Sequence, residues 1–460
     1  MLSRRKFLLS AGLTAACGLV LTGCKTGFKR KSYAGKNQQK PNVLFIILDD
    51  LNDWVGCLGG HPNAKTPNLD RFAAESMLFT SAYCTSPLCG PSRAAFLSGM
   101  RASTTGVYNN TDHYHEIIPD ALNMPLFFKN NGYFSCGAGK IFHGMYPEYW
   151  HEFIPKSDRM YHAGEPKMNG TDIPGIFDWG ALDVDDSEMD DYKMAQFAVD
   201  KLKAEHDKPF FLACGIYRPH APWYAPKKYF DMHHIDKISM PIVKKDDLDD
   251  VPPAGVRVAN LGYTKHVDAA GAAKKREAVQ AYLASVTFAD AQVGRVLKAL
   301  DESPYKDNTI VVILGDHGLH LGEKNKWHKD SLWEESCRAP LMIRVPGMTE
   351  AGSVCERTVS FLDLYPTLLS LCGLDMPSHL EGRDITTILK DPDSEWNYPA
   401  VTQRRANQVT IRDSRWRYIL YENGDEELYD HSKDPNEWHN LAADKKYDSV
   451  KEKLSLYIPK

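Results

Sequence analysis

The sequence lacks the features that mark several classes of protein. Its 460 residues carry 55 Lys and Arg against 60 Asp and Glu, so there is no excess of positive charge. With a formal net charge of -5, the chain is not expected to bind nucleic acid, although a local basic pocket could still hold an anionic group. No internal repeat is apparent. The apolar run at 7–21 is shorter than the roughly 20 residues of a membrane span.

Paired cysteines are also missing. None of the ten cysteines stands in the C-x-x-C spacing of a zinc site. Cys17, Cys24 and Cys89 fall in motifs described below, and the others are scattered singly: Cys57, Cys84, Cys136, Cys214, Cys337, Cys355 and Cys372. We expect most of these to be small buried hydrophobic residues. A Cys337–Cys355 disulfide remains open, but nothing in the sequence supports it.

The first 24 residues have the pattern of a bacterial export signal. Arg4 and Arg5 precede the apolar run 7–21, which suits the core of a signal peptide. The arginine pair predicts the twin-arginine route. The run ends in Leu-Thr-Gly-Cys, which is similar to a lipoprotein cleavage box, so Cys24 is predicted to carry lipid and to begin the mature chain. The alternative is a chance cysteine near an ordinary signal peptide.

These features predict an exported lipoprotein, in the periplasm or on the cell surface, anchored to the membrane at Cys24. Residues 25–40 are basic and polar, which suits a flexible tether between the anchor and a folded domain. Twin-arginine substrates cross the membrane already folded, so the thiols are expected to fold in a reducing compartment. The sequence does not define which leaflet holds the anchor.

Four apolar segments have the pattern of strands buried on both faces. Helical patterns separate them, the clearest at 278–300, where apolar residues recur every three or four positions. The predicted strands lie within Asn42–Asp50, Pro209–Pro222, Thr309–Gly318 and Leu341–Gly347. With 43% hydrophobic residues, the chain is expected to form an α/β domain in which a large mixed, mostly parallel sheet lies between helices.

The C-terminal part has a different pattern. A helix predicted at 361–374 is followed by a loop-rich connection at 377–399 and then by alternating strands, with Asn423–Gly424 as a hairpin turn. A terminal helix follows. We therefore predict a main domain at 41–396 and a small C-terminal subdomain at 397–460, built from an antiparallel β-sheet and a helix.

Polar side chains follow three predicted strands, and ligands of parallel α/β sheets bind at the carboxyl ends of the strands. The residues concerned are Asp49, Asp50, Arg218, His220, Asp316 and His317. Ionised neighbours such as Asp49 and Asp50 repel each other unless a cation lies between them. Together with Asp316 and His317, these acids predict a site for a hard divalent ion, calcium rather than magnesium. The alternative is that the acids only cap a helix or lie in a surface turn.

The acidic segment 178–191 is predicted to be a solvated loop that caps the following helix, in preference to a second metal site.

Cys89 stands directly before Gly90-Pro91, a pair that opens helices. A cysteine at a helix N-terminus faces unpaired backbone N–H groups, which favour anions and lower a thiol pKa. Arg93 lies one turn further on and is placed to steady a charged group at the same point. A buried inert cysteine does not need this arrangement, so Cys89 is predicted to take part in the chemistry.

The segment "CGPSRAAFLSG", Cys89–Gly99, resembles the C-x-P-S-R signature of the type I sulfatases, together with the helical run that follows it. The resemblance implies an alkaline-phosphatase-like fold and a maturation enzyme that oxidises Cys89 to formylglycine. The hydrated aldehyde has two hydroxyls: one attacks sulfur and displaces the sugar oxygen, and deprotonation of the other expels sulfate. The family also places one calcium ion on Asp49, Asp50, Asp316, His317 and residue 89.

The resemblance extends over nearly the whole chain from Pro41, and it is closest to the iduronate-2-sulfatase branch. The matching segments include "GKIFHG", "YRPHAPW" and "GDHGLHLGEKNKWHKDSLWEES". It implies that Lys140 and Lys329 neutralise the sulfate oxygens and that His143 takes the proton whose loss releases sulfate. His220 is implied to contact sulfate or to protonate the leaving oxygen. Three further residues either line a sugar pocket or only cover the loop: His320, Trp327 and His328.

The expected function is therefore removal of sulfate from a sulfated carbohydrate, and the branch implies a 2-O-sulfated uronic acid. Algal substrates, such as ulvan or carrageenan oligosaccharides, are an alternative. Two further alternatives are a phosphohydrolase of the same superfamily, which usually has a Ser or Thr nucleophile or two metals, and a non-catalytic glycan-binding protein. Loops at 146–191 and 227–275 are expected to read the sugar. The sequence does not define the sulfate position, endo or exo action, or the oligomeric state.

Overall fold

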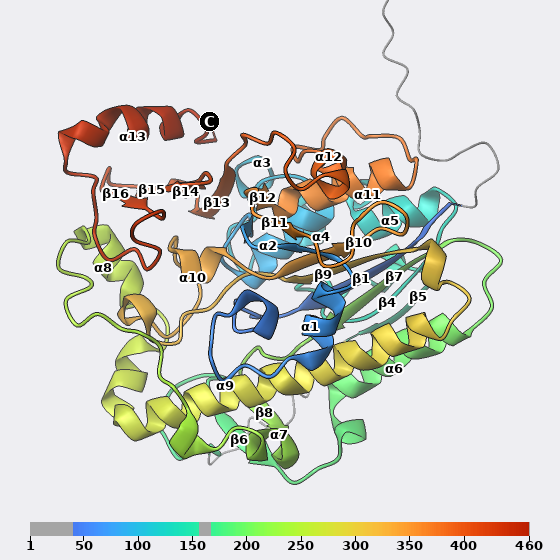
Figure 1. Cartoon of the computed structure of the whole chain (residues 1–460), viewed down its shortest axis with the longest axis horizontal. Coiled ribbons are helices and arrows are strands. Elements are labelled where there is room, and N and C mark those ends of the chain that lie inside the picture. Colours follow the sequence, from blue (N-terminus) through green and yellow to red (C-terminus); the bar gives the residue numbers. More distant parts are fainter. Residues whose placement is uncertain (1–39, 156–166, 460) are drawn as a thin grey trace, which may run out of the picture.

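The computed structural model describes residues 40–155 and 167–459 (Figure 1). The predicted export signal, the lipidation site Cys24 and all of the predicted tether except Lys40 lie outside these residues. Within them, no helix is both long and apolar enough to cross a bilayer. All eight described cysteines are free, which excludes the Cys337–Cys355 disulfide in this structure, and every one except Cys57 is buried.

The core of the fold is an 8-stranded sheet with the strand order β11-β2-β10-β9-β1-β7-β4-β5. Only β10 runs against its neighbours β9 and β2, and the other pairs are parallel. The four predicted strands are confirmed as β1, β7, β9 and β10. The bounds are β1 (Asn42–Leu48), β2 (Met77–Phe79), β4 (Phe134–Gly139), β5 (Glu152–Pro155), β7 (Phe210–Ile216), β9 (Thr309–Gly315), β10 (Leu341–Arg344) and β11 (Val354–Cys355).

The direction of β10 follows from the loop that precedes it. Residues 316–340 leave β9 at its carboxyl end, and Pro340 O is still beside that end, where it accepts from Gly315 N at 3.0 Å. Leu341 then pairs with Leu314. Because the chain has not crossed to the other end of the sheet, the next strand has to run back along β9. This loop carries His317 and Lys329.

Helices cover both faces of the sheet (Figure 1). Alternate residues of β1 point to opposite cores: Leu44, Ile46 and Leu48 to one, and Val43, Phe45 and Ile47 to the other. The first core is covered by α1 (Pro67–Ala73), α6 (Asp190–Lys203) and α9 (Thr264–Asp301), and the second by α2 (Cys89–Ser98), α5 (Met124–Asn130) and α11 (Leu364–Leu371). The helix predicted at 278–300 lies within α9, which begins earlier and has a kink at Gly271, where φ is 85°.

The remaining elements are short. The helices are α3 (Ala102–Thr105), α4 (Tyr114–Ile117), α7 (Lys227–Asp231), α8 (Pro253–Ala259), α10 (Glu334–Cys337) and α12 (Thr386–Lys390). The strands form two small pairs, β3 (Ala82–Tyr83) with β12 (Val359–Ser360), and β6 (Trp179–Leu182) with β8 (Trp223–Pro226).

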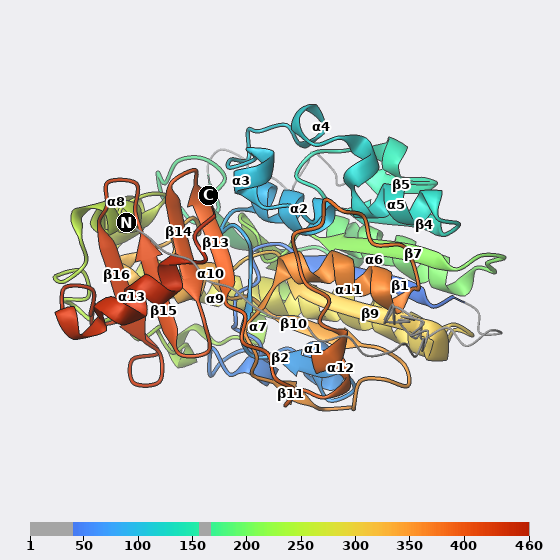
Figure 2. The same ribbon diagram turned by 90° about the horizontal axis from the view of Figure 1, so that it is seen from above.

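The C-terminal part is the predicted antiparallel sheet with a helix. Its strands are β13 (Ala400–Arg405), β14 (Gln408–Arg412), β15 (Trp416–Leu420) and β16 (Glu426–Asp430), and α13 (Asp448–Ser455) follows. The hairpin turn is confirmed, since Gly424 has a φ of 85° and donates to Tyr421 O at 3.0 Å. Figure 2 shows this sheet at one end of the molecule, with β13 nearest to the main sheet. The boundary after residue 396 stays a prediction.

Candidate active site

Three strand ends bring polar residues to one edge of the central sheet. Asp49 and Asp50 follow β1, and Asp316 follows β9. The backbone N–H of Asp49 donates to Ile216 O of β7 at 3.1 Å, and that of Asp316 donates to Leu48 O at 3.1 Å. The hydrogen-bond ladders of three adjacent parallel strands therefore continue into the acidic residues and fix their positions.

Cys89 is the first residue of helix α2, as predicted, and the N-cap is Leu88. The side chain is fully buried, yet it lies among polar groups. Its Sγ is 2.9 Å from Lys329 Nζ, 3.2 Å from His317 Nε2 and 3.8 Å from Asp50 Oδ1. Polar and charged groups at these distances favour a reactive thiol over an inert core thiol, which agrees with the predicted role of Cys89 in the chemistry.

Two lysines pair with the two adjacent acids. Lys140 Nζ contacts Asp49 Oδ2, and Lys329 Nζ contacts Asp50 Oδ1. Burial by itself raises the pKa of Asp49, but the surrounding basic side chains, Lys140 foremost, hold that pKa well below its usual value. The pKa of Asp50 is lowered in the same way, because His220 and Lys329 outweigh the effect of burial. Both carboxyl groups are therefore ionised near neutral pH.

Arg93 is fully buried and binds protein groups on several sides. Its Nε donates to Asp316 Oδ2 at 2.9 Å, and its Nη2 lies 3.4 Å from Asp49 Oδ1. Its Nη1 donates to Ile141 O at 3.0 Å and to Lys140 O. Arg93 was predicted to steady a charged group near Cys89. In the structure it holds the two strand ends and the segment of Lys140 together.

The acids and His317 fit a divalent cation. The ligand atoms of Asp49, Cys89, Asp316 and His317 all lie within 4.8 Å of one another. Asp49 Oδ1 is buried and accepts no hydrogen bond, which leaves a carboxylate oxygen for an ion. His317 Nδ1 lies 2.9 Å from Gly318 O, and a carbonyl can only accept, so Nε2 faces the cluster with its lone pair when the ring is neutral. The carboxylate ligands match the predicted hard ion, whereas imidazole is the more usual ligand of zinc, copper, iron or nickel.

His220 lies on the other side of Asp50. Its Nε2 is 3.9 Å from Asp50 Oδ2, and its Nδ1 is 2.6 Å from both Tyr217 Oη and Ala221 O. Burial, helped by Lys329, outweighs the attraction of Asp50 and lowers the pKa of His220 to about 3. The ring is therefore neutral near pH 7 in this arrangement. A neutral ring that donates from Nδ1 to Ala221 O presents the lone pair of Nε2 toward Asp50, and both roles predicted for His220, contact with sulfate and protonation of the leaving oxygen, stay predictions.

His143 is half-buried in the turn that follows β4, three residues beyond Lys140. His143 is not one of the described residues that line the cavity beside Asp50. Its predicted role in releasing sulfate stays a prediction.

The acidic segment 178–191 is not simply a solvated loop. Asp185 and Glu188 form a capping box, but it caps the 3-10 turn Asp186–Glu188 within the segment, and the N-cap of α6, Met189, makes no side-chain capping bond, so the predicted capping of the following helix is wrong. Asp191, however, is buried, and its carboxylate accepts from Tyr217 N at 2.6 Å and from Arg218 N at 3.1 Å. It therefore anchors the turn that carries His220. The burial of Asp191 could not be predicted from the run of acids, because its hydrogen-bond partners lie 26 and 27 positions further along the chain.

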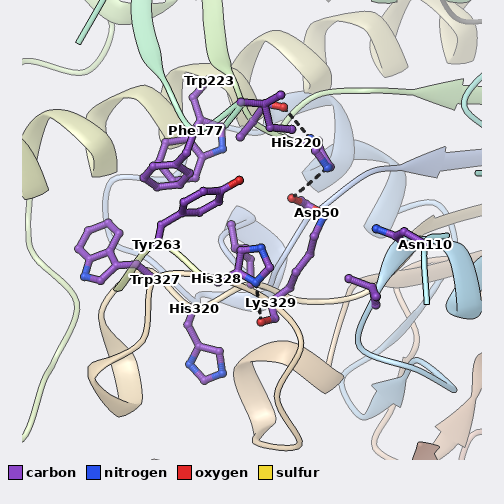
Figure 3. Close-up of a pocket in the computed structure, with 14 residues that line it drawn as sticks. Asp50, Asn110, Phe177, His220, Trp223, Tyr263, His320, Trp327, His328 and Lys329 are labelled. Atoms are coloured by element: carbon purple, nitrogen blue, oxygen red, sulfur yellow. Dashed lines mark hydrogen bonds and ion pairs between the residues drawn. The ribbon is translucent and has the colours of Figure 1, made fainter. Parts of the chain in front are cut away.

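A cavity of about 180 Å³ opens beside Asp50 (Figure 3). Its polar side has Asp50, His220 and Lys329, and the predicted sugar-pocket residues His320, Trp327 and His328 also line it. Sequence reasoning missed the remaining lining residues: Leu88, Asn110, Ile176, Phe177, Ala221, Trp223, Tyr263 and Leu319. Three of these, Ile176, Phe177 and Tyr263, come from the two loops that were expected to read the sugar. The rings of Phe177 and Tyr263 stack with centroids 4.2 Å apart, which gives the cavity an aromatic wall.

Comparison with known proteins assigns the family. The family model described as "Sulfatase" matches residues 41–374, and the model described as "N-sulphoglucosamine sulphohydrolase, C-terminal" matches residues 322–459. The chain therefore belongs to the sulfatase family, and the activity that this family implies is hydrolysis of sulfuric esters.

Several curated sulfatases are similar over most of the chain. A sulfatase of Formosa agariphila is 36% identical over 96% of this chain and 90% of its own length. The iduronate 2-sulfatase of Mus musculus is 31% identical over 73% of this chain and 69% of its own length. An ulvan-active sulfatase of Formosa agariphila is 27% identical over 99% of this chain and 88% of its own length. The predicted likeness to iduronate-2-sulfatases is thus confirmed.

Solved structures confirm the fold. The phosphonate monoester hydrolase of Silicibacter pomeroyi superimposes with a TM-score of 0.78, over 91% of this chain and 94% of its own, at 22% identity. At this identity the comparison concerns the fold alone, which is the predicted alkaline-phosphatase-like arrangement.

Replacement of Asp191 tests whether it positions His220. We expect Asp191→Ala to lower kcat/KM for a sulfate ester by about 10- to 100-fold, because a displacement near 1 Å at a catalytic group has effects of this size. Asp190→Ala is the matched control, since Asp190 is next in the chain and pairs only with Lys193 in the described ion pairs. Steady-state kinetics below the melting temperature of both variants make the comparison. Equal activities would show that Asp191 does not position the catalytic turn.

Proposed function

We propose that the protein removes sulfate from a sulfated carbohydrate, with Cys89 matured to formylglycine as the nucleophile. The observation that carries the proposal is the position of Cys89 in the sulfatase signature, at a helix N-terminus and in contact with Lys329, His317 and Asp50. A family member with an intact nucleophile site and a cavity beside it is suited to catalysis rather than to binding alone.

The residues around position 89 have separable roles in this proposal. One hydroxyl of the hydrated aldehyde attacks sulfur and loses its proton, the sulfur–oxygen bond to the sugar breaks, and the sugar oxygen takes up a proton and leaves as an alcohol. Loss of the proton on the second hydroxyl then releases sulfate and restores the aldehyde. Lys329 and Lys140 hold sulfate oxygens, and His220, on the side of Asp50, contacts sulfate or protonates the leaving oxygen. The proton acceptor for sulfate release is proposed to be His143.

Calcium is the proposed ion, held by Asp49, Asp50, Asp316, His317 and an oxygen of matured residue 89. When bound, it supplies positive charge that stabilises the negative charge developing on the transferred group. Formylglycine offers a hard oxygen in place of sulfur, which suits an oxygen-preferring ion better than the thiolate does.

The proposed substrate is a 2-O-sulfated uronic acid. The support is the likeness to iduronate 2-sulfatase and the cavity beside residue 89, whose aromatic wall suits the apolar face of a sugar ring. Sulfated ulvan oligosaccharides are the second candidate, because the ulvan-active relative aligns with 99% of the chain.

We also propose export as a lipoprotein through the twin-arginine route, with the lipid on Cys24.

The first experiment is the mass of the peptide that contains Cys89, from protein made in its native host. Conversion of the thiol to the aldehyde is expected to lower that mass by about 18 Da, as the chemistry of a reactive cysteine at this site requires. Matured protein is then assayed on heparan and dermatan fragments with a terminal 2-O-sulfated uronic acid, on ulvan oligosaccharides, and on their desulfated counterparts as controls.

The outcomes separate the candidates. Sulfate release from the 2-O-sulfated uronides supports the proposed substrate, and release from ulvan fragments alone replaces it with the second candidate. A peptide that keeps the unmodified cysteine in active protein contradicts the nucleophile assignment. Mature protein that releases phosphate but not sulfate would make a phosphohydrolase the better description, and binding without turnover would indicate a glycan-binding protein.

A further inference from the structure

Lys329 depends on an unusual backbone conformation in the next residue. Its Nζ contacts both Asp50 Oδ1 and Cys89 Sγ, the latter at 2.9 Å. Asp330 follows with a φ of 65°, in the left-handed region that residues with a side chain rarely adopt. Such a conformation persists only where the surroundings hold it in place. The contacts of Asp330 therefore determine where Lys329 can reach.

Two consecutive arginines from the C-terminal sheet hold Asp330. Arg404 Nε donates to Asp330 O at 2.9 Å, and Arg404 Nη2 donates to Asp330 Oδ2 at 3.0 Å. Arg405 Nη2 donates to the same Oδ2 at 3.2 Å. Asp330 N donates to Pro87 O at 2.9 Å, so its backbone is bound on both sides. Arg404 is only 5% exposed, and its planar group binds the backbone and the carboxylate at once.

Arg405 also binds a segment that contacts Gly90, the residue next to the nucleophile. Its Nη1 donates to Tyr108 O at 3.1 Å. Two residues further on, Asn110 Oδ1 accepts from Gly90 N, next to the nucleophile, at 2.7 Å. A side chain at position 90 would collide with this amide, since a Cβ there would lie 2.8 Å from Asn110 Oδ1. Figure 3 shows Asn110 and Lys329 on different sides of the same cavity.

We propose that Arg404 and Arg405 are positioning residues of the active site, through which the C-terminal subdomain holds Lys329 and the Tyr108–Asn110 segment beside residue 89. The arginines do not line the cavity, and their effect passes through Asp330 and Tyr108. The inference rests on the proposed role of Lys329 in binding sulfate. It makes the C-terminal sheet part of the catalytic apparatus.

Arg404→Gln is the principal test, on matured protein and with a sulfated saccharide that the wild type hydrolyses. We expect kcat/KM to fall by about 10- to 100-fold, since a lysine displaced by about 1 Å no longer holds the sulfate group. Arg415→Gln is the matched control. Arg415 belongs to the same subdomain and pairs with Asp430, away from Asp330, so this variant is expected to stay within about twofold of the wild type.

A mutant cycle separates positioning from loss of stability. In a Lys329→Ala background, Arg404→Gln is expected to change kcat/KM by less than about twofold, because the group that Arg404 positions is already gone. If the loss in that background equals the loss in the wild type, Arg404 acts on the fold in general and the proposal is wrong.

Asp330 offers a second test that does not depend on the arginine variant folding. Glycine adopts a positive φ without strain, whereas alanine does not. Asp330→Gly is therefore expected to keep at least about threefold more activity than Asp330→Ala, although both lose the carboxylate. Equal losses would show that the backbone conformation does not place Lys329.

Absence of sulfate release by the wild type contradicts the proposed function, whereas an active wild type with an unaffected Arg404→Gln variant contradicts only this inference.

Discussion

Cys89→Ala is expected to abolish turnover of every sulfate ester, with kcat reduced by at least about 10⁴-fold. Alanine cannot be matured to an aldehyde and offers no group that can attack sulfur. The fold should persist, because the side chain contributes few apolar contacts and its neighbours remain paired, Lys329 with Asp50 and Arg93 with Asp316. The measurement is sulfate release by matured wild type and variant at equal concentration, with thermal unfolding recorded for both.

Cys89→Ser gives the same prediction a chemical signature. Serine has one hydroxyl, so attack on sulfur would leave a stable sulfate ester that no second hydroxyl can expel. We expect no steady-state turnover, and a mass increase of about 80 Da on the peptide with residue 89 after incubation with substrate.

The matched control is Cys136→Ala. Cys136 is equally buried, in β4, and burial raises the pKa of its thiol to about 12, so it behaves as an apolar core residue. This variant should keep wild-type kcat. Normal turnover by Cys89→Ala would remove residue 89 from the reaction.

Asp316→Asn is expected to weaken calcium binding by at least about 100-fold and to lower kcat with it, because a ligand carboxylate is replaced by a neutral amide. The substitution keeps the shape of the side chain, but it takes a negative charge from beside Arg93, which is fully buried. A loss of about 3 kcal/mol in the free energy of unfolding is therefore expected as well.

Three measurements check this prediction: the calcium content of purified protein, calcium affinity after chelation, and recovery of activity as calcium is restored. Asp53→Asn is the control. Asp53 is also buried and pairs with Arg338, but it is outside the ligand cluster. It should lose stability without losing calcium. If Asp316→Asn bound calcium as the wild type does, Asp316 would not be a ligand.

The sequence predicts the central strands well because their signal is local. Val43–Leu48 is continuously apolar, and a segment with no polar face has to be buried on both sides, which restricts it to the interior of a parallel sheet. The direction of β10 has no such signal. The direction depends on the loop 316–340 staying at one end of the sheet. The apolar pattern of Leu341–Arg344 carries no information about the position of that loop.

The site divides in the same way. Asp49, Asp50, Asp316, His317 and Cys89 could be found because they stand at the ends of recognisable strands or in a signature. Asp191, Asn110 and Arg404 could not, since each acts through partners far away in the chain. Arg404 and Asp330, for example, are separated by 74 positions.

By itself, the sequence determined the class of fold and pointed to the proposed nucleophile and the residues proposed to hold a cation, because apolar runs and short motifs act over a few residues. Only the tertiary structure decided which side chains surround residue 89, that Asp191 is buried rather than solvated, and that Arg404 of the C-terminal sheet binds Asp330, the residue after Lys329. Long polar side chains such as Arg404 have no preferred partner until the backbone brings a carboxylate within reach, and that distance is a property of the whole fold.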